Sequence, residues 1–359
     1  MIRLKAVVLV IACAHFAASD GNVQQGVKFS YRGPLASAFT PFNNDKARTL
    51  NLSVIPKYAE FLALKNVSGV LVAGTYGQGT ALSIDERKKL AEAWLSAVGK
   101  TKQHLMIHVG GASLRDVKEL AAQAESIGVD SLLVQPELNA TSTEEIINYL
   151  ELVGRSAPRT LLIFYQNPLF KVKLDVEYFL TNVGKKVATF AGMKHVTDDF
   201  EELKTAWRLR QNYTIFIGMD AQTLSGCSLG MDSMITSTSS FIPELCFEIL
   251  RHCRSRAGLP KAREAQEAID RVVAEVDRYG TCVIQPIITY FRRPNGAHEI
   301  FAGDDTVTMK VATSMVADLP LGPPRPPLEI IPEENVMSMA RELKKMSLRT
   351  NEVAVLSVY

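Results

Sequence analysis

Short apolar runs alternate with longer amphipathic stretches along most of this chain. Between about residues 33 and 257, the short runs are rich in β-branched and aliphatic residues, which is typical of buried strands. The stretches between them have the apolar periodicity of helices that pack on one face. The expected strands are Leu35–Phe39, Gly69–Gly74, His104–Val109, Ser131–Val134, Thr160–Tyr165, Val187–Lys194, Thr214–Gly218 and Ser233–Thr236. The clearest helical stretches are Ile84–Val98, Leu114–Ile127, Thr143–Gly154 and Pro243–Arg256.

This alternation predicts an α/β fold. Strand–helix repeats indicate a parallel sheet, and eight of them predict a closed (β/α)8 barrel, a TIM barrel, rather than an open doubly wound sheet. The first unit also lacks the G-x-G-x-x-G turn of a dinucleotide-binding domain. We therefore expect one barrel over residues 29–257.

A C-terminal helical extension, packed on the barrel, is expected over residues 258–346. Its predicted helices are Ala262–Tyr279, Ile284–Phe291, Asp305–Val316 and Glu333–Met346. The proline-rich segment 319–332 lies between the last two helices. It fits either a ligand for an SH3-type domain or an extended crossing inside the fold. We favour the crossing, because helices flank the segment and no low-complexity region surrounds it. Residues 347–359 form a tail without a clear pattern.

The N-terminus has the order of a secretory signal peptide. Arg3 and Lys5 precede the apolar stretch Ala6–Ala14, and small residues at positions 17–19 come before Asp20. The apolar stretch is too short to span a bilayer comfortably. We expect residues 1–19 to be removed and the mature chain to be secreted or to lie in the endomembrane lumen. Four N-x-S/T sequons could carry glycans, although the first also suits a helix N-cap; they are Asn51, Asn66, Asn139 and Asn212.

Charge and composition narrow the partners. The chain has 359 residues, of which 47% are hydrophobic, so it can build a large core. Lys plus Arg number 40 against 38 Asp plus Glu, and no basic tract is interleaved with aromatic residues. The sequence therefore favours no nucleic-acid partner, and no membrane contact after signal cleavage.

Four cysteines remain after the predicted cleavage. An even number in a secreted chain favours disulfides. Cys246 and Cys253, however, lie seven positions apart on one predicted helix. Their Cα atoms would be about 10.5 Å apart along the axis, beyond the ~7 Å limit for a bridge. We therefore expect buried free thiols at these positions and at Cys227 and Cys282.

Reactive side chains fall at the ends of two expected strands. Lys194 ends one strand and Tyr165 ends the strand before it, so the barrel would direct both into one mouth. A neutral amine can condense with the ketone of a 2-oxo acid, and the resulting iminium accepts electrons when the neighbouring carbon–carbon bond breaks. A tyrosine can take the proton that this cleavage releases. A lone lysine at a strand end is more often a solvated charge, so the pair carries the hypothesis.

Polar residues follow three further strands. The turn Gly74–Gly79 and Thr75 could hold a carboxylate through backbone N–H groups and a hydroxyl. Gly218 and Asp220, with Thr236 and Ser237, offer groups suited to a polyol. Each is a weak signal alone. His104 and His108 lie four apart on a strand, which is not a metal-ligand pattern, and imine chemistry needs no cofactor. We expect neither metal nor cofactor.

From Phe29 to Leu328 the chain resembles the N-acetylneuraminate lyase / dihydrodipicolinate synthase family, most of all its animal lyase branch. The motifs that carry the resemblance are SAFTPF, NLSVI, GTYGQG, LSIDERKKLAEAW, IHVGG, FYQNP, FAGMK, GMDAQ and GPPRPPL. The resemblance implies that Lys194 forms the Schiff base and Tyr165 shuttles the proton. It also implies that Thr75 and the backbone of Tyr76 hold the carboxylate, and that the protein is a homotetramer.

The implied reaction is reversible cleavage of N-acetylneuraminate to pyruvate and N-acetylmannosamine. The chain departs from the family pattern at sugar-recognition positions, where Tyr76, Gln78, Val196, Ala221 and Thr236 replace the usual residues. A sister aldolase that acts on another 2-oxo-3-deoxy acid is therefore an alternative. A non-catalytic barrel that binds a keto acid or sugar is a third.

Overall fold

Eight parallel strands close into a barrel, as the sequence predicts. The computed structural model describes residues 29–136, 140–167, 174–197, 199–210, 213–280, 290–292, 298–300 and 305–357. The strands pair in sequence order and β8 returns to β1. They are β1 (Gly33–Ser37), β2 (Gly69–Val72), β3 (His104–His108), β4 (Ser131–Val134), β5 (Leu161–Gln166), β6 (Phe190–His195), β7 (Thr214–Ile217) and β8 (Ser233–Thr236).

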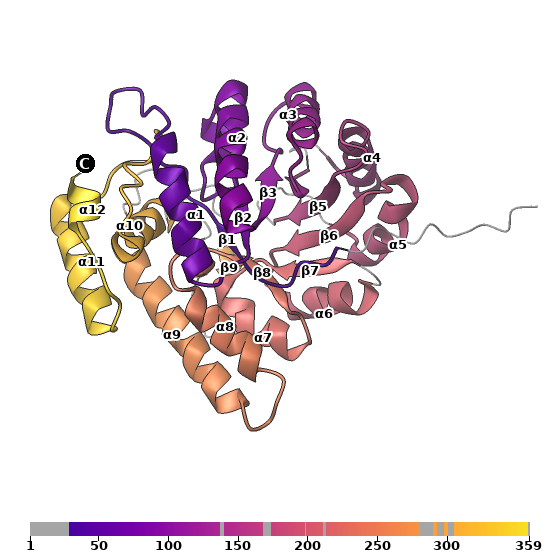
Figure 1. Cartoon of the computed structure of the whole chain (residues 1–359). Helices are drawn as coiled ribbons and strands as arrows, with labels where there is room; N and C mark the ends of the chain where they lie inside the picture. The colour runs from indigo at the N-terminus through magenta and orange to yellow at the C-terminus, as the bar shows by residue number, and fades with distance from the viewer. Residues whose placement is uncertain are drawn as a thin grey trace, which may run out of the picture.

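A ring of helices surrounds the barrel (Figure 1). Side-chain oxygens fix several helix starts, because they accept the unpaired N–H groups of the first turn. Ser83 and Glu86 form a reciprocal capping box at α2, and Asp199 caps α6. The helices are α1 (Ile55–Leu64), α2 (Ile84–Thr101), α3 (Leu114–Ile127), α4 (Thr143–Gly154), α5 (Val176–Lys186), α6 (Phe200–Leu209), α7 (Thr223–Ser228) and α8 (Pro243–His252).

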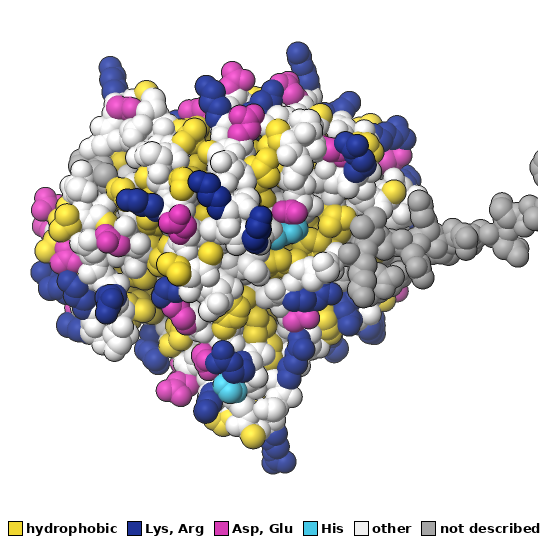
Figure 2. All heavy atoms as spheres, in the orientation of Figure 1, with side chains coloured by type: hydrophobic (Ala, Val, Ile, Leu, Met, Phe, Trp, Pro, Cys, Tyr) yellow, Lys and Arg dark blue, Asp and Glu magenta, His cyan; other side chains and the backbone are white. Residues whose placement is uncertain are grey.

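Two apolar cores follow from the alternation of side chains along the strands. One core fills the barrel interior and includes Leu71, Met106, Ile163 and Phe216. The larger core joins the outer strand faces to the helices. Charges of both signs are interspersed over the face drawn in Figure 2. Within the described residues, no helix is both long and apolar enough to cross a membrane.

The C-terminal extension packs on the barrel helices. Helix α9 (Leu259–Asp277) contacts α8, and α10 (Asp305–Ala317) and α11 (Glu333–Lys345) contact α9. These helices lie together on one side of the molecule in Figure 1, with α12 (Val353–Leu356) in the tail. The proline-rich segment crosses inside the fold, since Leu319 and Leu321 are buried. The prediction that this segment crosses inside the fold is therefore confirmed.

One predicted helix is wrong where the structure describes it. Residues 290–291, the end of the predicted helix Ile284–Phe291, belong to β9 (Tyr290–Arg292). This strand pairs antiparallel with β10 (His298–Ile300). Backbone pairing with a later segment overrides the local helical pattern here. Residues 284–289 lie outside the described part of the chain.

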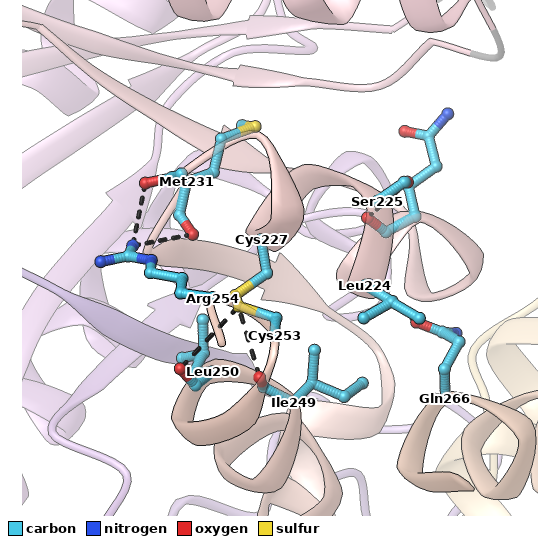
Figure 3. The surroundings of a disulfide bond; sticks show 11 residues. Leu224, Ser225, Cys227, Met231, Ile249, Leu250, Cys253, Arg254 and Gln266 are labelled. Carbon is cyan, nitrogen blue, oxygen red and sulfur yellow. Dashed lines mark hydrogen bonds between the residues drawn. A yellow bond between two sulfur atoms is a disulfide. The ribbon is translucent and has the colours of Figure 1, made fainter. Parts of the chain in front are cut away.

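The prediction of free thiols is also wrong for two cysteines. Cys227 in α7 and Cys253, just after α8, form a disulfide with Cα atoms 6.0 Å apart (Figure 3). The helical spacing does exclude a Cys246–Cys253 bridge, but it says nothing about neighbouring helices. Helices α7 and α8 pack together and bring Cys227 to Cys253. Cys246 is free and buried, and Cys282 lies outside the described residues.

Candidate active site

Sheet register places the two expected reactive groups side by side. Tyr165 and Lys194 are direct partners in the β5–β6 pairing, at the carboxyl ends of both strands. The Lys194 Nζ lies 4.4 Å from the centre of the Tyr165 ring. Both side chains are almost fully buried, with 4% and 2% exposure. The amine and the phenol therefore share one environment inside the barrel mouth.

Glycine at position 192 allows strand β6 to present the lysine. A Cβ at Gly192 would lie 2.1 Å from the carbonyl oxygen of Thr214 on β7, so any side chain would push the strands apart. The β5–β6 register shifts beside this glycine. Lys194 then faces the interior, whereas the next residue, His195, pairs with Glu202 of α6 at 3.0 Å. His195 is thus packed behind the site.

The phenol of Tyr165 is held from two sides. Its oxygen lies 3.3 Å from the Thr75 hydroxyl and accepts a hydrogen bond from Asn167 Nδ2 at 3.0 Å. Burial raises the pKa of Tyr165, but the charge of Lys194 and hydrogen bonds from Thr75, Asn167 and Lys194 outweigh it, so the pKa is lowered. A phenol with a lowered pKa suits proton transfer.

Asn167 is a site residue that the sequence prediction misses, although the sequence contains a signal for it. It lies two positions after Tyr165, and side chains two apart on an extended segment point the same way. His108, which does not fit a metal-ligand pattern in the sequence, also lies beside Tyr165. Its ring lies edge-on to Tyr165 with centroids 6.2 Å apart, and its Nδ1 donates to the Ala73 carbonyl at 3.0 Å. Burial and the charge of Arg87 lower the pKa of His108 to about 3, so the ring is neutral.

The Gly-rich turn after β2 is tightly built. A Cβ at Gly79 would lie 1.9 Å from the Ala73 carbonyl oxygen, and the Thr40 hydroxyl donates to the Gly77 carbonyl at 2.5 Å. Gln78 has a left-handed backbone with φ of 49°. Its side chain exchanges two hydrogen bonds with the backbone of Arg325, at 2.9 and 3.1 Å. The turn is therefore clamped by the proline-rich crossing, while Thr75 stays exposed at the mouth.

Asp220 and Ser237 are brought together, but the carboxylate has a structural task. It accepts hydrogen bonds from the Ser237 N–H at 3.1 Å, the Ser237 hydroxyl at 2.8 Å and the Thr238 N–H at 3.1 Å, and also from the Thr238 hydroxyl. It thus fixes the turn after β8. Thr236 is buried and bonds Ser239 at 2.7 Å within the same turn.

Gly218 leaves room for Val196. A Cβ at Gly218 would lie 2.4 Å from Val196 Cγ2, so the apolar side chain and the bare backbone fit together. The Gly218 N–H also donates to the His195 carbonyl at 3.1 Å. At this part of the rim the structure offers methyl groups and backbone rather than a side-chain hydroxyl.

Tyr76 reaches a residue that the sequence does not connect to the site. Its hydroxyl donates to Asp305 Oδ2 at 2.6 Å, and its ring meets the Phe39 ring edge-on at 5.7 Å. Burial, with the charges of Asp305 and Asp220, raises the pKa of Tyr76, so the phenol stays neutral. Asp305 begins α10 in the extension. No local pattern in the sequence marks it as part of the mouth.

Within the described residues, no group of three His, Cys, Asp or Glu side chains is placed to hold a metal ion. The site as described therefore combines a buried amine, a phenol of lowered pKa and a Gly-rich turn at one rim. This arrangement can form an imine and move a proton next to it.

Known proteins are similar to this chain in both sequence and fold. The dihydrodipicolinate synthetase family model matches residues 30–286. N-acetylneuraminate lyase of Gallus gallus is 30% identical over 321 residues, which cover 88% of this chain and 96% of the relative. The Homo sapiens enzyme of the same name is 28% identical over 326 residues, which cover 89% of this chain and 93% of the relative. The structure of Proteus mirabilis N-acetylneuraminate lyase superposes with a TM-score of 0.77 at 24% identity, covering 90% of this chain and all of that one. The chain therefore belongs to the dihydrodipicolinate synthetase family and is an enzyme of the carbon–carbon lyase type.

Proposed function

We propose that this enzyme cleaves N-acetylneuraminate reversibly to pyruvate and N-acetylmannosamine. The observation that carries the proposal is the Tyr165–Lys194 register pair, with Thr75 beside the phenol. The curated relatives that are similar along most of the chain are N-acetylneuraminate lyases, which supports the choice of substrate.

The chemistry follows from these groups. The Lys194 amine attacks the C2 ketone and water leaves, which forms an iminium ion. Tyr165 takes the proton of the C4 hydroxyl as the C3–C4 bond breaks, and the electron pair moves into the iminium to form an enamine. The aldehyde leaves, C3 is protonated, and water releases pyruvate from Lys194. Thr75 and the backbone of the Gly-rich turn would hold the substrate carboxylate.

Trapping with borohydride tests the imine. Wild-type protein incubated with pyruvate and borohydride should carry a reduced adduct on the Lys194 peptide, detected by mass spectrometry. Lys194→Arg should carry none, because a guanidinium stays charged and cannot attack. An adduct on another lysine, or none at saturating pyruvate, would contradict the assignment and favour a barrel that only binds its ligand.

A sister aldolase for a shorter 2-oxo-3-deoxy acid is the second candidate. The packing of Val196 against Gly218 and the reach of Tyr76 to Asp305 both favour it, since neither presents the family's usual group to a sugar tail. Rates of pyruvate release from N-acetylneuraminate and from the shorter acid separate the two. A preference for the shorter acid of tenfold or more, about 1.4 kcal/mol, would overturn the first choice.

We also infer that the chain enters the secretory pathway. The charged, apolar and small-residue order of residues 1–19 supports this, and so does the Cys227–Cys253 disulfide, because such bridges persist in oxidising compartments. Expressed in eukaryotic cells, the mature chain should begin near Asp20 and lose mass on glycosidase treatment. An intact Met1 in a cytosolic fraction would refute the proposal.

Family resemblance further supports a homotetramer. Light scattering of the purified mature chain should give four times the chain mass, and a monomeric mass at micromolar concentration would contradict it.

A further inference from the structure

The backbone that leads into the Gly-rich turn has a strained residue at its start. The sheet register pairs the last residue of β2 with Ile107 of β3, so Ala73 and His108 follow side by side. Ala73 has a left-handed backbone, with φ of 57°, although it is not a glycine. An alanine keeps this conformation only where neighbouring groups hold it, because its Cβ crowds the following carbonyl.

Ala73 is held from two sides. The Nδ1 of His108 donates to the Ala73 carbonyl at 3.0 Å, and both residues are buried, with 3% and 2% exposure. The turn folds back on the other side of Ala73, since a Cβ at Gly77 would lie 3.1 Å from the Ala73 amide nitrogen. Packing of the turn therefore fixes the amide side of Ala73, and His108 fixes the carbonyl side.

We propose that His108 is a positioning residue for the cleavage step: its Nδ1–H holds Ala73 in the left-handed conformation, which aims Thr75 at the phenol of Tyr165. Thr75 comes two positions after Ala73, and its hydroxyl lies 3.3 Å from the Tyr165 oxygen. A rotation of the Ala73 backbone would move that hydroxyl away from the phenol. The inference rests on the proposed lyase function and adds to it a residue that touches neither the amine nor the transferred proton.

The surroundings of His108 determine which ring nitrogen donates. Burial and the charge of Arg87 lower the pKa of His108 to about 3, so the ring is neutral and has one N–H. The Ala73 carbonyl can only accept, which places that proton on Nδ1. Arg87 of α2 also donates to the carbonyls of His108 at 2.6 Å and Gly110 at 3.0 Å. Because α2 follows the Gly-rich turn, the end of β3 is tied to the chain on both sides of that turn.

Two substitutions at His108 separate the donor from the shape. Asparagine and leucine have similar branched shapes, but only the asparagine amide can donate from a point close to that of Nδ1. His108→Leu should lower kcat/KM for cleavage by about tenfold, which corresponds to ~1.4 kcal/mol. His108→Asn should stay within about threefold of wild type, because its hydrogen bond to Ala73 is kept. The substrate is whichever of the two 2-oxo acids the wild type cleaves faster.

Ala73→Gly tests whether His108 acts through the backbone of Ala73. Glycine adopts a positive φ without the Cβ penalty, so the turn depends less on the histidine. When His108→Leu is added to Ala73→Gly, kcat/KM should fall by no more than about threefold, because the two residues act on the same backbone. A histidine that only fills space in β3 would cause the same loss beside alanine and beside glycine.

His104→Leu is the matched control. His104 lies at the opposite end of β3, and its ring is 2.8 Å from the Ser131 hydroxyl. Its substitution should lower the Tm without changing kcat/KM. If His108→Leu does not fold, His108→Gln takes its place with the same expected loss, because the longer side chain carries its amide toward the Nε2 side of the ring.

Borohydride trapping of pyruvate keeps the two proposals distinguishable. Wild type and every variant should form the adduct, since Lys194 is unchanged. With the adduct present, three results would each overturn the role of His108 and leave the lyase proposal intact: wild-type kcat/KM in His108→Leu, an undiminished loss beside Ala73→Gly, or an equal loss in folded His104→Leu. Absence of the adduct in wild type overturns the proposed function, and the role of His108 with it.

Discussion

The environment of Tyr165 favours the phenolate form and lowers the pKa of the phenol. An ordinary tyrosine has a pKa near 10, so it holds its proton too tightly to accept one in exchange. Here the Lys194 charge and two hydrogen bonds, from Thr75 and Asn167, stabilise the phenolate. The buried ring of His108 is neutral and adds no competing charge.

Tyr165→Phe should separate imine formation from cleavage. The variant keeps the aromatic ring that lies 4.4 Å from the Lys194 Nζ, so the borohydride adduct with pyruvate should still form. Cleavage should fall by about 10²–10⁴-fold, because only the proton transfer is lost. Pyruvate release measured against trapping checks the prediction, and full activity would mean that another group moves the proton.

At the residue scale, position along the strands gives much of the candidate site. Lys194 and Tyr165 end predicted strands, and a barrel collects strand ends at one rim. Strand ends alone do not predict that Asp220 fixes the turn after β8. The hydrogen bonds that its carboxylate accepts come from Ser237 and Thr238, and the path of that turn depends on β8. Asp305 lies 229 positions from Tyr76, and only the packing of the extension joins them.

Among the elements, the proline-rich crossing contributes to the site because it holds the Gly-rich turn through the backbone of Arg325. Arg325 forms a two-armed ion pair with Glu86, both contacts at 2.8 Å, and donates to the carbonyls of Ala81 and Arg48. Glu86 also completes the capping box of α2, and the Arg325 charge and hydrogen bonds lower its pKa. One arginine therefore secures the crossing, the start of α2 and, through its backbone, Gln78.

Arg325→Ala should weaken both stability and substrate binding. Losing a largely buried ion pair should cost about 2 kcal/mol of unfolding free energy, after allowance for the partial exposure of Glu86. Because the Gly-rich turn loses its clamp, KM for pyruvate in the condensation should rise more than kcat falls. Denaturant titration and steady-state kinetics check this. Arg341→Ala, at an exposed position of α11, should change neither, and an unchanged KM in Arg325→Ala would separate the crossing from the turn.

The disulfide gives a second prediction at this scale. Cys227 and Cys253 lie 26 positions apart, so the bridge closes a loop that spans β8 and α8. Cys253→Ser should lower the unfolding free energy by about 3 kcal/mol, since the unfolded chain regains the freedom of that loop. Thermal melting checks it. A reductant should lower the Tm of wild type toward that of the variant and leave the variant unchanged; an unaffected wild type would contradict the bridge.

Element boundaries show where sequence patterns are sufficient. Ser131–Val134 and Ser233–Thr236 are strands as predicted, and every residue in both is buried, as expected for parallel strands that are covered on both faces. The segment ending at Phe291 has a similar apolar character, yet Tyr290–Arg292 is a strand, since its partner His298–Ile300 comes later in the chain. The prediction of free thiols at Cys227 and Cys253 was wrong for the same reason, because their pairing depends on how α7 and α8 pack.

For the molecule as a whole, a buried lysine in the extension makes stability depend on pH. Lys310 in α10 is 2% exposed, donates to the Pro323 carbonyl at 2.9 Å and lies 4.5 Å from the centre of the Phe42 ring. Burial, with the charges of Arg325 and Arg48, holds its pKa well below the usual value. Between that lowered pKa and ~10.4, the unfolded chain binds the extra proton, so the free energy of unfolding rises with pH across this range.

Lys310→Met should remove this dependence. The variant should be more stable than wild type at pH 7, because folding no longer removes a proton from the lysine or buries its charge. The loss of the hydrogen bond to the Pro323 carbonyl, worth about 1 kcal/mol, offsets only part of this gain. Its unfolding free energy should change less between pH 7 and 10. Urea titrations across that range provide the measurement. Lys57→Met, on the exposed face of α1, should keep the wild-type slope, and an equal slope in Lys310→Met would contradict the prediction.

The clamp of the proline-rich crossing on the Gly-rich turn also sets an order of events during synthesis. Arg325 is made 131 residues after Lys194 (325 − 194), which takes roughly 7–26 s at ~5–20 residues per second. Over the last 72 residues of that interval (325 − 253), the nascent chain contains the amine, the phenol and both cysteines of the bridge, but its Gly-rich turn has no partner for Gln78. We therefore expect the bridge to oxidise before the mouth is complete, and the enzyme to become competent only as its last segments leave the ribosome.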